Sequence, residues 1–203
     1  MSHRDAPRLR ILLAQECARL IAEEGMADFR AAKRKAALRM AIADKSLLPD
    51  NREIEQALFD YQRLFQADRQ PQRLRALREA ALEAMRLLAR FRPKLVGAVL
   101  SGAAGPNTPI QLHVFADAPQ EVALFLLELR IPFDAGERRL RLGNGDQACL
   151  PVFRFNAGEH ELDLTVFAPL AEREAPRSPV DGRPMRRAGS ADIPALLAEH
   201  PQR

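Results

Sequence analysis

Cysteine and histidine are scarce in this chain of 203 residues. The two cysteines, Cys17 and Cys149, are far apart, and neither has a second cysteine or a histidine at the spacing of a metal-binding motif. The four histidines are equally scattered along the chain. This pattern indicates neither a disulfide framework nor a zinc site, and we expect both thiols to be buried on apolar faces.

Long apolar runs are also missing. No segment approaches the roughly 18 consecutive apolar residues that span a membrane, and the first ten residues lack the apolar centre of a signal peptide. We therefore expect a cytoplasmic protein without a membrane partner. A hydrophobic content of 47% is enough for one core together with a helical extension.

Positive charge is concentrated in the first part of the chain. Residues 1–92 contain 19 Lys and Arg against 13 Asp and Glu, a net charge of +6, whereas residues 93–170 contain 6 against 9, a net charge of −3. Arginine far outnumbers lysine. This bias fits phosphate recognition by planar guanidinium groups, and it equally fits the codon usage of a GC-rich genome.

Four helices are predicted before residue 93. Apolar residues recur at helical spacing in residues 8–24, 51–66 and 72–91, and residues 29–43 combine alanines with long unbranched side chains. The sequence also indicates where two of these helices begin. Asp28 is placed as an N-cap, and Asp50 followed by Glu53 has the spacing of a capping box.

The densest positive cluster lies in the second predicted helix. A solvated helix face explains such a cluster, and the alternative is an anionic partner such as RNA or the phosphates of a nucleotide. Only Phe29, at the edge of the cluster, is aromatic, so base stacking and sequence-specific recognition are not supported. The candidate anion-binding residues are Arg30, Lys33, Arg34 and Lys35, with Arg39 close by.

The hydrophobic period changes from helical to alternating near Pro93. We expect a helix over residues 119–130 that is buried on most of its circumference, with Asn144-Gly145 and residues 156–158 as turns. Beyond residue 169 the chain is rich in Pro and Arg, which favours a solvated tail, although Arg186 and Arg187 could instead fold back over the sheet. The predicted strands cover residues 94–100, 110–115, 138–142, 149–155 and 161–167, and another strand could begin at residues 131–133.

The predicted fold class is α+β. A helical region, residues 1–92, precedes a mixed β-sheet with a packing helix, residues 93–170, and a Pro/Arg-rich tail with a short helix over residues 193–199 completes residues 171–203.

The segment 91–167 resembles the active-site region of the polymerase-beta-type nucleotidyltransferase superfamily. Its signature is a short strand, the loop SGAAGPNTP and a second strand, IQLHVF. In that family a Gly-Ser pair ends the first strand and an Asp-x-Asp opens the second. The resemblance places Ser101 at the serine, Leu100 at the preceding glycine and Gly105 at a later glycine, in a loop a few residues shorter than usual.

The same resemblance places Pro109 and Gln111 at the two aspartates of the metal-binding motif. Asp163, on a later strand, fits the third family carboxylate. Proline offers no ligand, an amide offers a weak one without charge, and Mg²⁺ prefers carboxylate and phosphate oxygens. The resemblance therefore implies a nucleotidyltransferase-like domain without a metal site or catalytic residues. Its implied nucleotide-binding residues are Ser101, Gly102, Gly105, Gln111 and Asp163.

Three functions remain open from the sequence. The first is a non-catalytic protein that binds a nucleotide, an RNA end or a protein partner. The second is an active, Mg²⁺-dependent nucleotidyltransferase that uses another carboxylate set, for example Asp117, Asp163 and either Glu159 or Glu161. The third is a helical interaction module that the sheet supports. A serine hydrolase is disfavoured, because the residues around Ser101 do not form a Gly-x-Ser-x-Gly motif.

Overall fold

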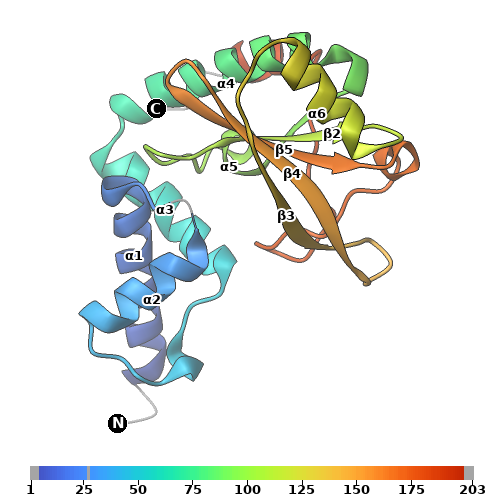
Figure 1. Cartoon of the computed structure of the whole chain (residues 1–203). Coiled ribbons are helices and arrows are strands. Elements are labelled where there is room, and N and C mark those ends of the chain that lie inside the picture. Colours follow the sequence, from blue (N-terminus) through green and yellow to red (C-terminus); the bar gives the residue numbers. More distant parts are fainter. Residues whose placement is uncertain (1–4, 27, 199–203) are drawn as a thin grey trace. The chain divides into compact units, whose positions relative to one another are not determined.

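The computed structural model of the chain describes residues 5–26 and 28–198, and their contacts form two compact units (Figure 1). The described residues of Met1–Arg73, Ala103–Thr108 and Pro179–Asp181 form the first, which we call the helical unit. Those of Leu74–Gly102, Pro109–Ser178 and Gly182–Arg203 form the second, the sheet unit. The limits between the units fall within helix α4, at the two ends of Ala103–Thr108 and at the two ends of Pro179–Asp181, and each unit is described by itself.

The helical unit is built on α1 (Asp5–Glu24), which packs against α2 (Phe29–Arg39) and α3 (Asn51–Phe65). Both predicted caps are confirmed. The Asp28 carboxylate accepts hydrogen bonds from two backbone N–H groups of α2, and Asp50 and Glu53 form a complete capping box. The fully buried side chains of the unit include Leu13, Cys17, Leu20, Ile54 and Leu58.

Helix α4 (Arg69–Leu87) begins earlier than the sequence pattern predicts. We expected Gln70 and Pro71 to form a break before the helix. Pro71 instead occupies the first turn, where a missing N–H is not needed for an intrahelical hydrogen bond. The helix starts in the helical unit and continues in the sheet unit.

The sheet unit contains a five-stranded mixed sheet with the order β1-β2-β5-β4-β3. Strand β2 (Ile110–Phe115) runs parallel to β5 (His160–Phe167), and the other neighbouring pairs are antiparallel. The predicted α+β class is confirmed. The remaining strands are β1 (Lys94–Val96), β3 (Asp134–Arg141) and β4 (Gln147–Ala157).

Strand β1 is shorter than predicted, since we expected it to reach residue 100. Gly97 has φ +70°, a left-handed conformation that turns the chain out of the strand, and α5 (Gly97–Ser101) follows. The prediction of a strand over residues 94–100 is therefore wrong beyond Val96, where Val99 and Leu100 are buried on a helix. Apolar residues in a short run do not distinguish the two conformations.

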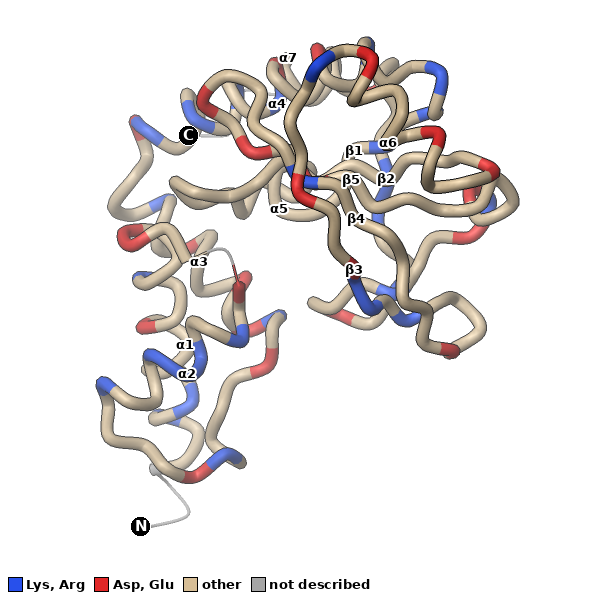
Figure 2. Tube along the Cα trace, in the orientation of Figure 1, with Lys and Arg blue, Asp and Glu red and all other residues tan. Residues whose placement is uncertain are grey.

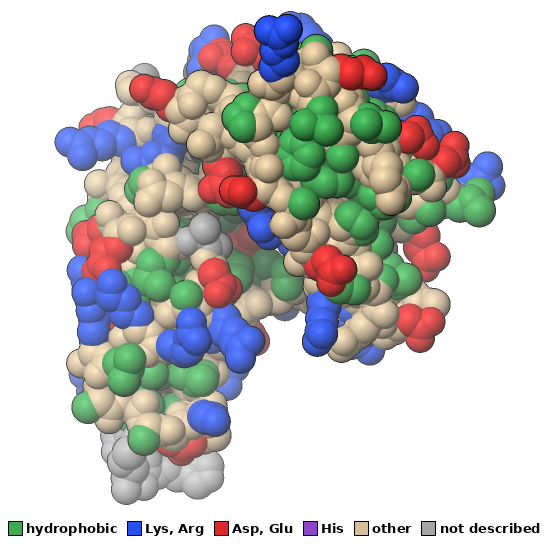
Figure 3. All heavy atoms as spheres, viewed as in Figure 1, with side chains coloured by type: hydrophobic (Ala, Val, Ile, Leu, Met, Phe, Trp, Pro, Cys, Tyr) green, Lys and Arg blue, Asp and Glu red, His purple; other side chains and the backbone are tan. Residues whose placement is uncertain are grey.

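Helix α6 (Pro119–Glu128) is more exposed than its apolar sequence predicts. Val122 and Leu126 are its buried residues, whereas Leu124, Leu127 and the adjacent Leu129 are exposed. Figure 3 shows hydrophobic side chains gathered over this helix. The expectation that the sheet covers most of α6 is thus wrong, because one flat sheet face contacts only one side of a helix.

The C-terminal segment is not simply a solvated tail. Ala188 is buried and pairs with Leu95 of β1, so this part of the chain adds a bridge to the sheet edge. A short helix, α7 (Ile193–Ala198), follows as predicted, and Glu199, the last residue of the predicted helix, lies outside the described residues. Cys149, expected to be buried, is exposed, whereas Cys17 is buried. None of the helices in the described residues has the length and apolarity needed to cross a membrane.

Candidate functional site

A row of polar side chains crosses one face of the sheet in the sheet unit. Gln111 on β2 is the register partner of Asp163 on β5, and Asp163 is also the register partner of Arg154 on β4. Directly opposite residues in neighbouring strands point to the same face of a sheet. Two of the residues implied by the resemblance, Gln111 and Asp163, are therefore brought together.

Asp163 is the buried centre of this row. Its residue is only 3% exposed, and its Oδ2 accepts hydrogen bonds from Nη2 of Arg138 at 2.6 Å and from Nε of Arg154 at 3.3 Å. Arg138 also donates through Nη1 to Oγ1 of Thr165 at 3.2 Å. Within the described residues, the buried Oδ1 of Asp163 has no hydrogen-bond partner. An unsatisfied buried carboxylate oxygen is costly unless a ligand or water supplies a donor.

The charge at this centre is positive rather than negative. Two guanidinium groups face one carboxylate, and both arginine side chains remain partly exposed. Within residues 5–26 and 28–198, no three His, Cys, Asp or Glu side chains gather closely enough to hold a metal ion. The centre is therefore suited to an anion, since Mg²⁺ requires several oxygen ligands and would be repelled by the arginines.

Next to this row lies a neutral histidine. His113 is the register partner of Thr165, and its Nδ1 accepts a hydrogen bond from Nε of Arg187 at 3.0 Å. Burial lowers the pKa of His113 to about 3, and the charges of Arg187 and Arg138 act in the same direction. The imidazole is consequently uncharged at neutral pH.

Arg187 reaches His113 from the C-terminal segment. Its guanidinium lies 5.1 Å from the ring centroids of both Phe115 and Phe167, and Nη1 donates to the carbonyl oxygens of Ala171 and Glu172. Burial lowers the pKa of Arg187 from its ordinary value. Of the two alternatives for this arginine, folding back is the one observed, and the expectation of a solvated side chain is wrong.

Gly97, which lies outside the residues implied by the resemblance, is beside Gln111. A Cβ atom at this position would collide with Oε1 of Gln111, so only glycine leaves this amide in place. Since β1 ends at Val96, the pair that follows the strand is Gly97-Ala98, and not Leu100-Ser101 as the resemblance placed it. Between Gly97 and Gln111 the connection is correspondingly longer than we expected.

The other three residues of the predicted nucleotide site do not lie on the strands that carry the polar row. Ser101 is the exposed last residue of α5, and Gly102 caps this helix with φ +96°. Gly105 belongs to the helical unit, where a Cβ would lie 2.8 Å from the carbonyl oxygen of Ile21. Nucleotide binding by these three residues stays a prediction, as it does for Gln111 and Asp163.

The basic cluster lies on α2 in the helical unit, where Figure 2 shows its positive residues along the helix. Lys35 is ion-paired with Glu24 of α1, and Arg39 is ion-paired with Glu16 and Glu24. Arg30 and Arg34 are exposed, and Lys33 is half-buried. Part of the cluster thus joins α2 to α1, and anion binding by Arg30, Lys33 and Arg34 stays a prediction.

The alternative carboxylate set does not converge. Glu161 shares a strand face with Asp163, but Asp117 lies beyond the end of β2, six residues from Gln111. At about 3.3 Å per residue, this separation is roughly 20 Å along the strand direction. Glu159 is exposed in the turn between β4 and β5.

Comparison with known proteins gives little further information. No family model matches the chain, and no curated protein matches it. Among solved structures, the Cid1 poly(U) polymerase with MgGTP bound is similar over 49% of this chain and 34% of its own length, with 20% sequence identity and a TM-score of 0.32. The chain therefore spans about a third of that polymerase, and a likeness of this size carries no functional argument.

Proposed function

We propose that this chain is a nucleotidyltransferase-like binding protein that does not transfer nucleotides, and that the polar row on its sheet takes a phosphate-bearing ligand without a metal ion. The ligand class is a nucleotide or the phosphate of an RNA end. The observation that carries this proposal is the pairing of Asp163 with both Arg138 and Arg154. The two arginines thus neutralise the carboxylate that the resemblance assigns to the metal.

The remaining donors and acceptors of the row fit such a ligand. Arg138 and Arg154 each have further N–H groups that can donate to phosphate oxygens, and the planar guanidinium suits two parallel hydrogen bonds. Gln111, the neighbour of Asp163 in register, can both donate and accept.

Catalysis is disfavoured by the same arrangement. Transfer of a nucleotidyl group depends on metal charge against the developing negative charge at phosphorus, and this charge is normally held by several carboxylates. Here the two positions that the resemblance assigns to the Asp-x-Asp motif are Pro109 and Gln111. Asp163 faces arginines instead of a second carboxylate.

Thermal unfolding with ATP, CTP or UTP, each in Mg²⁺ and in EDTA, tests the binding step. We expect stabilisation of equal size in both conditions, because a ligand that binds only the folded state stabilises it by mass action. Arg138→Lys retains a charge beside Asp163 but loses the guanidinium fork, so it should reduce the stabilisation. Arg139→Lys is the matched control, since Arg139 is exposed and points to the other face of β3. Stabilisation that appears only with Mg²⁺ would contradict the proposal.

Incubation with labelled nucleoside triphosphates and RNA or protein acceptors tests the absence of transfer. We expect no label on any acceptor. Label transfer by the natural chain that is abolished in Asp163→Asn would instead show an active enzyme. Pro109→Asp combined with Gln111→Asp should create Mg²⁺-dependent stabilisation, because position 111 is the register partner of Asp163 and the two added carboxylates offset the charges of the two arginines.

A further inference from the structure

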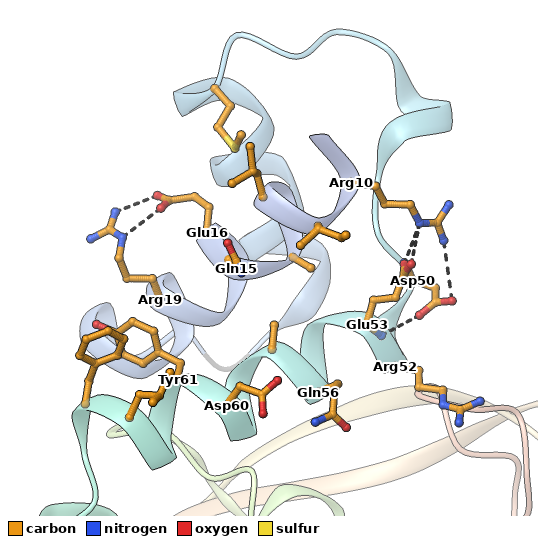
Figure 4. Close-up of a pocket in the computed structure, with 17 residues that line it drawn as sticks. Arg10, Gln15, Glu16, Arg19, Asp50, Arg52, Glu53, Gln56, Asp60 and Tyr61 are labelled. Atoms are coloured by element: carbon orange, nitrogen blue, oxygen red, sulfur yellow. Dashed lines mark hydrogen bonds and ion pairs between the residues drawn. The ribbon is translucent and has the colours of Figure 1, made fainter. Parts of the chain in front are cut away.

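An open groove runs between α1 and α3 on the helical unit, and all of the residues that line it belong to this unit (Figure 4). Its volume is about 1150 Å³. Pockets for small ligands are typically about 300–1,000 Å³ and largely enclose the ligand. A groove of this size between two exposed helices fits a helical partner better than a small molecule.

Large apolar side chains are exposed at the two ends of the groove. Ile11 and Leu12 of α1 lie at one end, near the start of α3, where Arg10 pairs with Glu53. Leu64 and Phe65 of α3 lie at the other end. Each of these four apolar side chains is between 41% and 70% exposed. In the middle of the groove the apolar side chains are small, namely those of Ala14 and Ala57.

On the wall formed by α3, side chains of opposite charge lie four residues before and four residues after Gln56, and Asp50 and Glu53 add two carboxylates near the start of the helix. Arg52, Gln56 and Asp60 follow one another at intervals of four residues, and Figure 4 shows them side by side along the helix. Residues with this spacing share one helix face. A two-fold axis at Gln56 would place Arg52 of one copy against Asp60 of the other, twice, and would place the two amides together.

We propose that the groove is the interface of a homodimer in which α3 of one copy packs antiparallel to α3 of a second copy. In this arrangement Leu64 and Phe65 of each copy lie over Ile11 and Leu12 of the other. An interface of this kind must be self-complementary, because the same surface occurs on both sides of the axis. The charge order of α3 and the placement of the apolar residues both meet this requirement.

The charges available on α3 agree with this pairing. Within the described residues, Arg52 has no ion-pair partner in its own chain. Asp60 has Arg63, at 3.4 Å and with both side chains largely exposed. Such a pair contributes little, so Asp60 is free to face a second copy. A foreign helix of unrelated sequence would not require opposite charges at equal distances on the two sides of Gln56.

Sedimentation of the full chain over a concentration series tests the proposal. We expect a reversible dimer. Arg52→Asp and Asp60→Arg should each raise the dimer dissociation constant by about tenfold or more, because each places like charges together at both contacts. The double variant Arg52→Asp/Asp60→Arg restores opposite charges and should recover the dissociation constant. Arg34→Asp makes the same charge change on α2 and should leave it unaltered.

Cross-linking provides a second measurement that does not depend on affinity. Gln56→Cys in a Cys149→Ser background should form a covalent dimer with a bismaleimide of about 8–10 Å, the usual distance between packed helices. Cys17 is buried and should not react. Arg34→Cys in the same background should not form a covalent dimer. A chain that is monomeric at all concentrations, or a dimer that is unaffected by the α3 changes, would overturn the proposal.

Discussion

The two units of this chain use charge in opposite ways. In the helical unit, ion pairs such as Arg10–Glu53 and Arg19–Glu16 lie at the surface and join neighbouring helices or turns. In the sheet unit, Asp163 is buried beneath two arginines and His113 is buried and uncharged. Surface pairs are easily exchanged for water, whereas buried charges stay only where the structure supplies their partners.

This difference suggests different roles for the units. The sheet unit places two partly exposed guanidinium groups around one buried carboxylate, and their remaining N–H groups can donate to a small anionic ligand. The helical unit instead exposes apolar residues in a groove of mixed charge, which suits another helical surface. This difference supports the proposals that the sheet unit binds a ligand and that the helical unit associates with a second copy.

The largest expected effect comes from removing the buried carboxylate. Asp163→Ala leaves Arg138 and Arg154 without their shared partner and should lower the free energy of unfolding by about 3 kcal/mol. Glu16→Ala is the comparison in the helical unit, where this carboxylate pairs with Arg19 and Arg39. It should cost about 1 kcal/mol or less. Urea unfolding measures both values, and equal losses would remove the contrast between the units.

Gly97 tests how closely the backbone determines the position of Gln111. Gly97→Ala should cost about 2 kcal/mol, because the left-handed conformation disfavours alanine and the new Cβ displaces the amide of Gln111. Gly158 has φ +62° but open space around it, so Gly158→Ala should cost only about 1 kcal/mol. Adding Gln111→Ala to Gly97→Ala should remove the difference. If the larger cost of Gly97→Ala persists in the double variant, the contact with Gln111 does not cause it.

Acid should destabilise the two units in different pH ranges. The pKa of His113 falls from 6.5 in the unfolded chain to about 3 in the fold, so the unfolded state binds the extra proton between these values. Stability is therefore complete above pH 6.5 and decreases below it, by up to about 1.4 kcal/mol per pH unit. His113→Gln, which can still accept from Arg187, should flatten this dependence.

The helical unit responds only at lower pH. Hydrogen bonds from Arg19 and Arg10 hold the pKa values of Glu16 and Glu53, respectively, below their ordinary value of 4.5. Their contribution is present above pH 4.5 and is lost as the pH falls through the lowered values. Hydrogen exchange between pH 6.5 and pH 5 should therefore show losses of protection in the sheet unit first. Simultaneous losses in both units would contradict this order.

The smallest effect on stability is expected on α2. Replacing Arg30, Lys33 and Arg34 with alanine, and leaving the ion-paired Lys35, should change the free energy of unfolding by less than about 0.5 kcal/mol. If these residues bind an anionic partner, the variant should retain less RNA and show a flatter salt dependence. Retention that is unchanged over the salt series would leave only a solvated helix face.

Local chemistry in the sequence was sufficient for the order of helices and strands and for several of their limits. Asp28, Asp50 and Glu53 fixed two helix starts because capping depends on residues within one turn. The turn predicted at Asn144-Gly145 and the strand predicted over residues 110–115 are also confirmed, because both depend on residues close together in sequence. The errors at Gly97 and Pro71 arose where a single residue permits two local conformations.

Only the tertiary structure decided what surrounds Asp163. Arg138 and Arg154 lie 25 and 9 residues away in sequence, and nothing in the alternation of β3 or β4 specifies the register that brings them to this carboxylate. The contact of Arg187 with His113 spans 74 residues in the same way. The sequence could show that carboxylates are missing from the expected motif. It could not show that two arginines pair with the remaining carboxylate, because the identity of a side chain is local and the identity of its neighbours depends on how the strands pair.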